Sequence, residues 1–171
     1  MCYRTLPVLN LSSMRFPGFV CLFLLVAQVS VAQGPEMPAY SQGYDPGRDP
    51  FADGRAALQL AKGTRRYVLI EVGGDWCSWC HVLDRFLQGH PSLQARLHKT
   101  FVLLKVNVDE ENDNAAFLSA FPQALGYPHM YVTDNAGSIL ASQDTAEFLE
   151  NGKYSEKRFQ RFLDHWSGSH E

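Results

Sequence analysis

The chain has 171 residues, of which 46% are hydrophobic, and a formal net charge of −3 at pH 7. This length is sufficient for one domain with a full hydrophobic core. Lys and Arg form no basic patch, which argues against nucleic acid and against an anionic membrane surface as partners.

The first residues are typical of a secretory signal peptide. Residues 19–32 form an apolar run that ends at Ala32 in a small-x-small cleavage pattern. The run is short for a membrane span and is followed by a polar segment. We therefore expect residues 1–32 to be removed, with translation starting at Met1 or Met14, and the exported protein to have no membrane span.

Removal of this segment would also remove Cys2 and Cys21, so that Cys77 and Cys80 remain as one pair. In an oxidising compartment two cysteines allow a single intramolecular disulfide. The loss of two arginines would lower Lys+Arg from 15 to 13 against 18 Asp+Glu, which gives a net charge of −5. The position of the remaining pair favours chemistry over a purely structural bridge.

The pair lies in the motif Trp76-Cys77-Ser78-Trp79-Cys80-His81, which follows the apolar run Tyr67–Val72 and two glycines. This order predicts a strand followed by a helix, a context in which Cys-x-x-Cys is a redox motif rather than a metal site. At positions i and i+3 the two sulfurs face the same way, close enough to form a disulfide. The first cysteine would lie at the helix N-terminus, where N–H groups and the helix dipole favour a thiolate.

The motif is compatible with three other interpretations. Cys-x-x-Cys-His is also the attachment signature of c-type haem, for which Met130 or a histidine would serve as the distal ligand. A haem protein would carry the motif on a helix near the mature N-terminus rather than behind a strand. A structural zinc site would need a second Cys or His pair at regular spacing, and the sequence has none. The third interpretation is an inert pair of structural cysteines.

Glu71 interrupts the apolar run of the strand that precedes the motif. Burial of an acid costs free energy unless the acid has a partner or a role, and desolvation raises its pKa. We interpret Glu71 as a proton acceptor for the buried thiol of Cys80. The alternative is a solvated edge position in which Glu71 pairs with Arg65 or Arg66.

The other segments predict one α/β domain over residues 51–167, preceded by a Pro/Gly-rich linker over residues 33–50 and followed by a tail over 168–171. Tyr40 and Tyr44 of the linker are expected to be incidental or packed on the domain. Helices are expected over 50–61, from the motif to Gly89, over 92–97, over 115–124 and from Ser155 onward, and strands over 67–72, 101–108, 128–132 and 138–142, with a loop over 143–154. The first helix would have Asp49 as its N-cap and Gly63 as its end, and the last helix would bury an apolar stripe of Phe159, Phe162, Leu163 and Trp166. The β-α-β order followed by a hairpin predicts a mixed sheet of about four to five strands with helices on both faces.

Residues 51–167 resemble a thioredoxin-fold domain, with most similarity to exported thioredoxin-like proteins and to the electron-delivering domains of periplasmic disulfide reductases. The resemblance rests on the Gly-x-Trp-Cys-x-x-Cys stretch, on the next strand around Leu104–Asp109, on Glu71 as a buried acid and on Pro128 as a cis-proline. A proline is usually excluded from central strands, so a cis Tyr127–Pro128 bond in a loop that faces the cysteines would explain its place.

The resemblance also implies roles for these residues. Cys77 would be the attacking nucleophile and Cys80 the resolving thiol, which form the Cys77–Cys80 disulfide when oxidised. Pro128 would hold the substrate-facing loop, in which Tyr127 offers its backbone to an incoming peptide.

The sequence departs from thioredoxin in three places. Ser78-Trp79 replaces Gly-Pro between the cysteines, and Trp79, like Trp76, would shape the choice of partner. His129 follows the cis-proline position, where thioredoxins have Thr, and His81 follows the second cysteine. Either imidazole would favour a thiolate electrostatically, and we favour His129; the alternative for each is a surface histidine.

The sequence thus predicts an exported, periplasmic thiol:disulfide oxidoreductase that acts in cell redox homeostasis, as a monomer without metal or cofactor. Its partners would be proteins with disulfides or thiols and an upstream thiol electron donor. Such dithiols span from about −270 to about −120 mV, so the residues leave the direction of electron flow open, and the resemblance favours a reductase. The alternatives are a c-type haem electron carrier and a thioredoxin-fold binding module without redox turnover.

Overall fold

The computed structural model describes residues 37–167, which all fall in one compact unit of the chain. The expected signal peptide over 1–32 and the tail over 168–171 lie outside the described residues. Within residues 37–167 no helix has the length and apolar character needed to cross a membrane.

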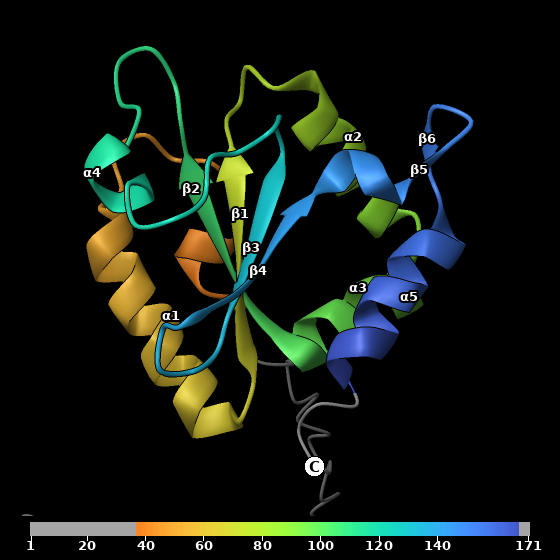
Figure 1. Cartoon of the computed structure of the whole chain (residues 1–171), viewed down its shortest axis with the longest axis horizontal. Coiled ribbons are helices and arrows are strands. Elements are labelled where there is room, and N and C mark those ends of the chain that lie inside the picture. Colours follow the sequence, from red (N-terminus) through yellow and green to blue (C-terminus); the bar gives the residue numbers. More distant parts are fainter. Residues whose placement is uncertain (1–36, 168–171) are drawn as a thin grey trace, which may run out of the picture. The chain divides into compact units, whose positions relative to one another are not determined.

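The described chain contains helices on either side of one sheet (Figure 1). The helices are α1 (Pro50–Thr64), α2 (Ser78–Gln88), α3 (Pro91–Thr100), α4 (Ala115–Leu118) and α5 (Glu156–Ser167), with 3-10 turns η1 (Ala39–Ser41) and η2 (Thr145–Phe148). The strands are β1 (Tyr67–Gly73), β2 (Phe101–Asn107), β3 (His129–Thr133) and β4 (Ile139–Asp144), and a short ribbon is formed by β5 (Leu149–Glu150) and β6 (Lys153–Tyr154).

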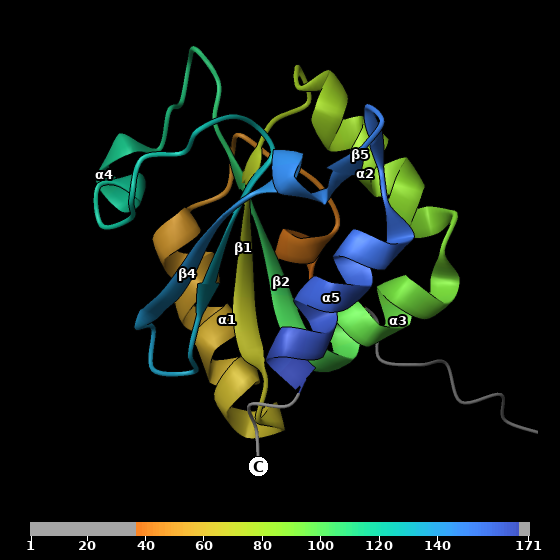
Figure 2. The ribbon, with the colours of Figure 1, turned by 45° about the vertical axis from the view of Figure 1, so that its right-hand side comes forward.

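The main sheet is mixed, with the strand order β2-β1-β3-β4. Strand β1 runs parallel to β2 and antiparallel to β3, and β4 pairs antiparallel with β3. Helices α1 and α4 cover one face, while α2, α3 and α5 cover the other (Figures 1 and 2). The predicted mixed sheet with helices on both faces is therefore confirmed.

Alternate residues of the central strands belong to two separate hydrophobic cores, because successive side chains of a strand point to opposite faces of the sheet. Val68 and Ile70 of β1 pack towards α1, and Leu69 packs towards α2, α3 and α5. The predicted apolar stripe of α5 is confirmed, since its members are all buried: Phe159, Phe162, Leu163 and Trp166.

The segment before α1 differs from the expected linker, because it packs on the domain. Ser41 Oγ donates a hydrogen bond to the Leu103 carbonyl at 2.5 Å, which fixes η1 along the edge strand β2. Tyr40 is buried in the α1-side core, and Tyr44 is buried against the two cysteines. The physical reason is burial of the apolar rings of Tyr40 and Tyr44, which removes their surface from water. Of the two alternatives expected for Tyr40 and Tyr44, incidental or packed on the domain, packing on the domain is confirmed.

Helix α1 begins as predicted but ends later. The Asp49 side chain accepts a hydrogen bond from the Phe51 N–H at 2.9 Å, with Pro50 in the first turn. Gly63 does not end the helix. It ends after Thr64, where Arg65 takes a left-handed conformation with φ of 53°.

Two further differences concern the second half of the chain. The helix expected over 115–124 is the single turn α4, because Pro122 lacks an N–H and disfavours helix in the residue before it. The Pro122 carbonyl is instead bound by the Tyr131 hydroxyl at 2.6 Å. The loop expected over 143–154 contains the end of β4, the turn η2 and the β5–β6 ribbon.

Candidate active site

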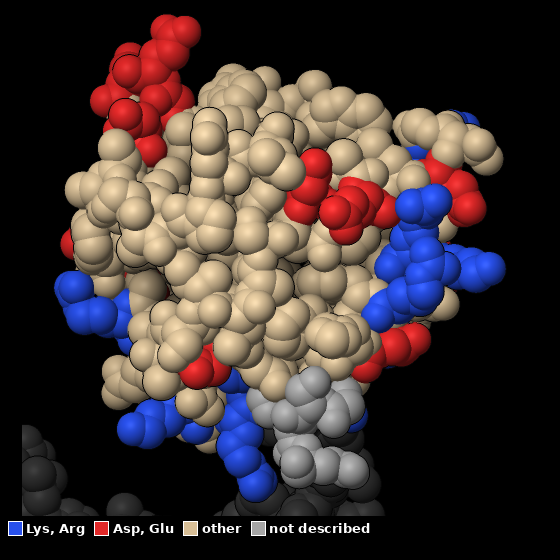
Figure 3. All heavy atoms as spheres, in the orientation of Figure 1, with Lys and Arg blue, Asp and Glu red and all other residues tan. Residues whose placement is uncertain are grey.

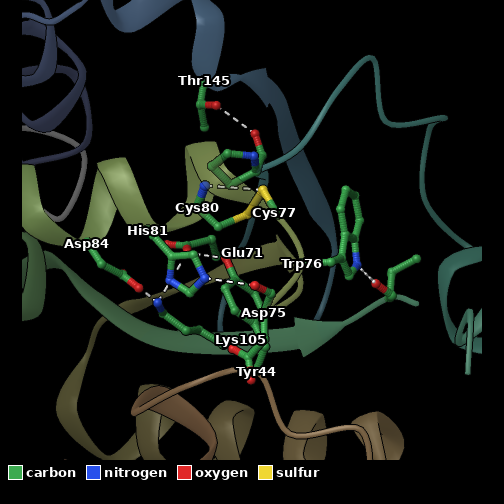
Figure 4. Close-up of a disulfide and its surroundings, with 12 residues drawn as sticks. Tyr44, Glu71, Asp75, Trp76, Cys77, Cys80, His81, Asp84, Lys105 and Thr145 are labelled. Atoms are coloured by element: carbon green, nitrogen blue, oxygen red, sulfur yellow. Dashed lines mark hydrogen bonds and ion pairs between the residues drawn. A yellow bond between two sulfur atoms is a disulfide. The ribbon is translucent and has the colours of Figure 1, made fainter. Parts of the chain in front are cut away.

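The two cysteines form a disulfide where β1 leads into α2 (Figure 4). Cys77 is the N-cap of α2, and its Sγ accepts a hydrogen bond from the Cys80 N–H at 3.1 Å. In the reduced protein this N–H and the helix dipole would stabilise a thiolate on the Cys77 sulfur. Cys77 is 4% exposed and Cys80 is completely buried, so the first cysteine is the more accessible one.

The two glycines between β1 and the motif provide room for side chains of the site. A Cβ on Gly73 would lie 2.5 Å from Cys80 Sγ and 2.8 Å from the Tyr44 hydroxyl oxygen. A Cβ on Gly74 would lie 2.5 Å from Trp76 Nε1. Only glycine therefore allows the sulfur, the phenol and the indole to approach the end of β1 so closely.

Glu71 lies in a buried network beneath the disulfide. It is 1% exposed, and its Oε1 accepts a hydrogen bond from the Tyr44 hydroxyl. Lys105, its register partner on β2, places Nζ 3.4 Å from the same oxygen and 2.6 Å from Asp84 Oδ1 (Figure 4). The alternative of an edge position paired with an arginine is wrong, because β1 is an interior strand and Lys105 supplies the positive charge.

Burial dominates the proton affinities of this network. It raises the pKa of Glu71, although the charge of Lys105 and the Tyr44 hydrogen bond oppose the rise. Burial lowers the pKa of Lys105, but the carboxylates of Glu71 and Asp84 outweigh it and raise that pKa overall. Burial and the neighbouring Glu71 raise the pKa of Tyr44 well above its usual range. Tyr44 therefore remains a hydrogen-bond donor.

The loop before β3 has the geometry predicted for it. The Tyr127–Pro128 peptide bond is cis, and Thr145 Oγ1 donates a hydrogen bond to the Pro128 carbonyl at 2.6 Å. Since His129 pairs with Val72, this proline lies at the same end of the sheet as the cysteines.

The two histidines have different environments. His129 is completely buried, with Nε2 2.9 Å from Ser142 Oγ, so the alternative of a surface histidine is wrong for it. Burial lowers the pKa of His129, which works against the charge-based role that we expected. His81 is exposed and places Nε2 2.8 Å from the Asp75 carbonyl (Figure 4).

Three aromatic side chains near the motif remain exposed. Trp76 is 58% exposed, although its Nε1 donates to the Val108 carbonyl at 2.5 Å, and its ring meets the exposed Tyr127 ring edge-on. Trp79 is exposed and contacts the Tyr154 ring of β6 edge-on. An open hollow between Trp76 and the loop after β2 is rimmed by Asp109, Glu110 and Glu111, in the region where acidic side chains gather in Figure 3.

Four residues of the site were missed by sequence reasoning: Tyr44, Asp84, Lys105 and Thr145. Lys105 had a signal, since it is a lone charge in an apolar strand, as Glu71 is. Asp84 follows Cys80 by four residues and so shares its helix face. Tyr44 and Thr145 had no signal, because they reach the site through tertiary packing.

Comparisons with known proteins agree with this geometry. The family model described as thioredoxin-like matches residues 49–134, half of the chain. The chain therefore belongs to the thioredoxin-like family.

Residues 37–167 contain no group of three or more His, Cys, Asp or Glu side chains placed to hold a metal.

The curated relatives are much longer proteins. The chain is 27% identical over 99 residues to the thiol:disulfide interchange protein DsbD of Vibrio vulnificus, which covers 58% of this chain and 16% of that protein. The thiol:disulfide interchange protein DsbD of Salmonella paratyphi A is 29% identical over 99 residues, which are 58% of this chain and 17% of that protein. An uncharacterised Caenorhabditis elegans protein is 30% identical over 73 residues, 43% of this chain and 10% of that protein.

Two solved structures share the fold. The disulphide isomerase from Xylella fastidiosa has a TM-score of 0.62 at 23% identity and covers 78% of this chain and 99% of that one. The oxidised DsbD C-terminal domain of Neisseria meningitidis has a TM-score of 0.50 at 18% identity. The match covers 72% of this chain and 97% of that domain. The predicted thioredoxin fold is confirmed. Together, the family and the Cys77–Cys80 pair support the predicted enzyme class, a disulfide oxidoreductase.

Proposed function

We propose that this protein is an exported thiol:disulfide oxidoreductase that exchanges its Cys77–Cys80 disulfide with protein thiols and works as a reductase. One observation carries the proposal: the disulfide lies at a helix N-terminus, with one sulfur at the N-cap and the other buried above an acid. That arrangement makes the two cysteines chemically unequal, as nucleophile and resolving thiol must be.

The reaction begins with the reduced protein. The Cys77 thiolate attacks a substrate disulfide, a mixed disulfide forms, and one substrate sulfur leaves as a thiolate. Cys80 then attacks the Cys77 sulfur, its proton passes to Glu71, and the second substrate sulfur leaves. The substrate gains two electrons, and the protein is left with the Cys77–Cys80 disulfide. The dithiol itself carries the electrons, so this cycle needs no metal or cofactor.

The surface around the cysteines fits an extended peptide. The exposed rings of Trp76, Trp79 and Tyr127 offer apolar contact area of the kind enriched at protein interfaces. Tyr127 precedes the cis-proline, so its backbone is the expected pairing partner for a substrate strand. Pro128 holds this loop, with its carbonyl fixed by Thr145.

The proposed setting is the periplasm. The signal-like N-terminal sequence supports export, and relatives named thiol:disulfide interchange protein DsbD support a role in exchange among protein partners. In this setting the protein would act as a monomer in cell redox homeostasis, with an upstream thiol donor that re-reduces its disulfide.

The direct test measures catalytic reduction of a protein disulfide and traps the mixed disulfide with the substrate. With dithiothreitol as electron donor, the purified protein is expected to reduce a disulfide-containing protein such as insulin. Cys77→Ser should abolish turnover, and Cys80→Ser should accumulate a mixed disulfide, visible by mass. A Cys77→Ser variant as active as the wild type would contradict the proposal and favour a binding module.

A c-type haem carrier is disfavoured by the fold. Its motif would belong to an all-helical protein, whereas here it follows an interior strand of a mixed sheet and its sulfurs are joined to each other. Absence of a haem mass increment on the purified exported protein is the expected result.

A further inference from the structure

We propose that Tyr44 is a positioning residue for the resolving step: its hydroxyl holds the Glu71 carboxylate beside Cys80 as the acceptor of the thiol proton. The proposal rests on the thiol–disulfide exchange proposed above and assigns a residue from outside the motif to it. Tyr44 comes from the segment before α1, which the sequence presented as a linker.

The segment brings Tyr44 to the site by passing around the edge of the sheet. Ser41 binds the Leu103 carbonyl of the edge strand β2, and Tyr40 is buried on the α1 side. Tyr44, four residues later, is buried with Cys77 and Cys80 on the other side. The two tyrosines of one segment therefore pack against opposite faces of the same sheet.

The Tyr44 hydroxyl lies close to both the acid and the buried sulfur. It donates a hydrogen bond to Glu71 Oε1. Glu71 and Gly73 lie two residues apart on β1, so they share one face of the sheet. The Cys80 sulfur and the Tyr44 hydroxyl both approach that face at Gly73, 2.5 and 2.8 Å from the position of a Cβ. Phenol, carboxyl and thiol are therefore neighbours in one buried space.

The charged and titratable groups around this space come from several elements. Lys105 of β2 places Nζ 3.4 Å from Glu71 Oε1 and 4.8 Å from the centre of the Tyr44 ring. Asp84 of α2 binds the same ammonium group and raises the pKa of both Glu71 and Tyr44. Tyr154 of β6 makes a smaller contribution to the raised pKa of Tyr44. Glu71 thus has two partners, the neutral hydroxyl of Tyr44 as a hydrogen-bond donor and the charged ammonium group of Lys105.

The same segment also forms part of a small cavity next to the acid. The cavity has a volume of about 110 Å³, and its lining includes Ser41, Gln42, Glu71, Asp84 and Lys105. A polar space of this size can hold water. Glu71 can therefore release a proton on the side away from the disulfide.

The resolving step then runs as follows. With the substrate sulfur bound to Cys77, the Cys80 S–H bond breaks and its proton passes to the Glu71 carboxylate. The Cys80 sulfur bonds to the Cys77 sulfur, and the substrate leaves with the electron pair of the broken S–S bond. Tyr44 keeps its own proton and only holds the acceptor.

The test uses Tyr44→Phe and the disulfide probe 5,5′-dithiobis(2-nitrobenzoate). Attack by Cys77 on the probe releases one coloured thiolate, and resolution by Cys80 releases a second, so the two steps are read separately. Loss of the hydroxyl removes a hydrogen bond that lowers the pKa of Glu71. The acid limb of the second release is therefore expected to move up by about one to two pH units, with the first release changed less than about twofold.

Two further variants test the assignment to this tyrosine and to this acid. Tyr40→Phe makes the same change in the same segment on the opposite face and should leave both releases as in the wild type. In a Glu71→Gln background, Tyr44→Phe should add no further shift, because Tyr44 acts through the carboxylate. If Tyr44→Phe does not fold, 3-fluorotyrosine at position 44, a stronger donor, should move the limb to lower pH.

The outcomes separate this inference from the proposed function. If the wild type releases fewer than two equivalents, thiol–disulfide exchange itself fails. If it releases two and Tyr44→Phe has the wild-type pH profile, only the role of Tyr44 is overturned. The role of Tyr44 would also be overturned if Tyr44→Phe shifted the pH profile of the second release equally in the wild-type and Glu71→Gln backgrounds.

Discussion

Substitution of Gly73 by alanine is expected to destabilise the protein severely. The new Cβ would lie 2.5 Å from the Cys80 sulfur and 2.9 Å from Cζ of the Tyr44 ring. Ordinary contacts between such atoms are about 3.5–4.0 Å, so the added methyl overlaps two buried side chains by about 1 Å. Neither can move outward, because Cys80 is completely buried and Tyr44 is hydrogen-bonded to Glu71.

Overpacking of this kind costs about 1–3 kcal/mol, and displacement of the Tyr44 hydroxyl from Glu71 adds to it. We therefore expect a loss of about 3 kcal/mol, measured by urea unfolding of the oxidised protein. Gly63→Ala is the matched control, since a Cβ at that helical position meets nothing within 4 Å. It should stabilise the protein by about 0.8–1.0 kcal/mol. A Gly73→Ala variant as stable as the wild type would refute this description of the site.

Three further predictions concern the groups around the disulfide. Lys105→Met leaves Glu71 without its charged partner and should cost about 3–5 kcal/mol in urea unfolding; a loss below about 1 kcal/mol would contradict the buried pair. Because the folded-state pKa of Glu71 is raised, the folded protein binds its proton more tightly than the unfolded chain does. The free energy of unfolding of the wild type, relative to that of Glu71→Gln, should therefore fall as pH rises from the ordinary carboxyl range through the raised pKa. A relative free energy of unfolding that rises over this range would contradict the raised pKa of Glu71. Thr145→Val leaves the Pro128 carbonyl without its donor and should cost about 1–3 kcal/mol by thermal unfolding, with an unchanged midpoint as the contrary result.

The sequence predicted the parts of the fold that depend on local pattern. The stripe of α5, the apolar strands and the Asp49 cap follow from spacing within one segment, and the structure has all of them. The motif and Pro128 were found because each breaks a local rule. A cysteine pair directly after a strand and a proline at the start of one both need a special explanation.

The parts that were missed depend on which segments meet. Pro122 limits α4 to one turn, although the residues after Ala115 favour a longer helix. Tyr44 joins the site only because its segment crosses the edge of β2. His129 was placed on the surface in one interpretation, yet the pairing of β3 with both β1 and β4 buries it. Neighbours of this kind are set by tertiary packing.

The most direct test of the proposed function is the redox equilibrium of the purified protein. The protein is equilibrated in dithiothreitol or glutathione buffers, alkylated, and weighed by mass spectrometry to count its free thiols. A reversible two-electron couple between Cys77 and Cys80, near the thioredoxin value of about −270 mV, is expected of a reductase. A potential near about −120 mV would contradict the direction proposed here, and the absence of a reversible couple would contradict thiol–disulfide exchange itself.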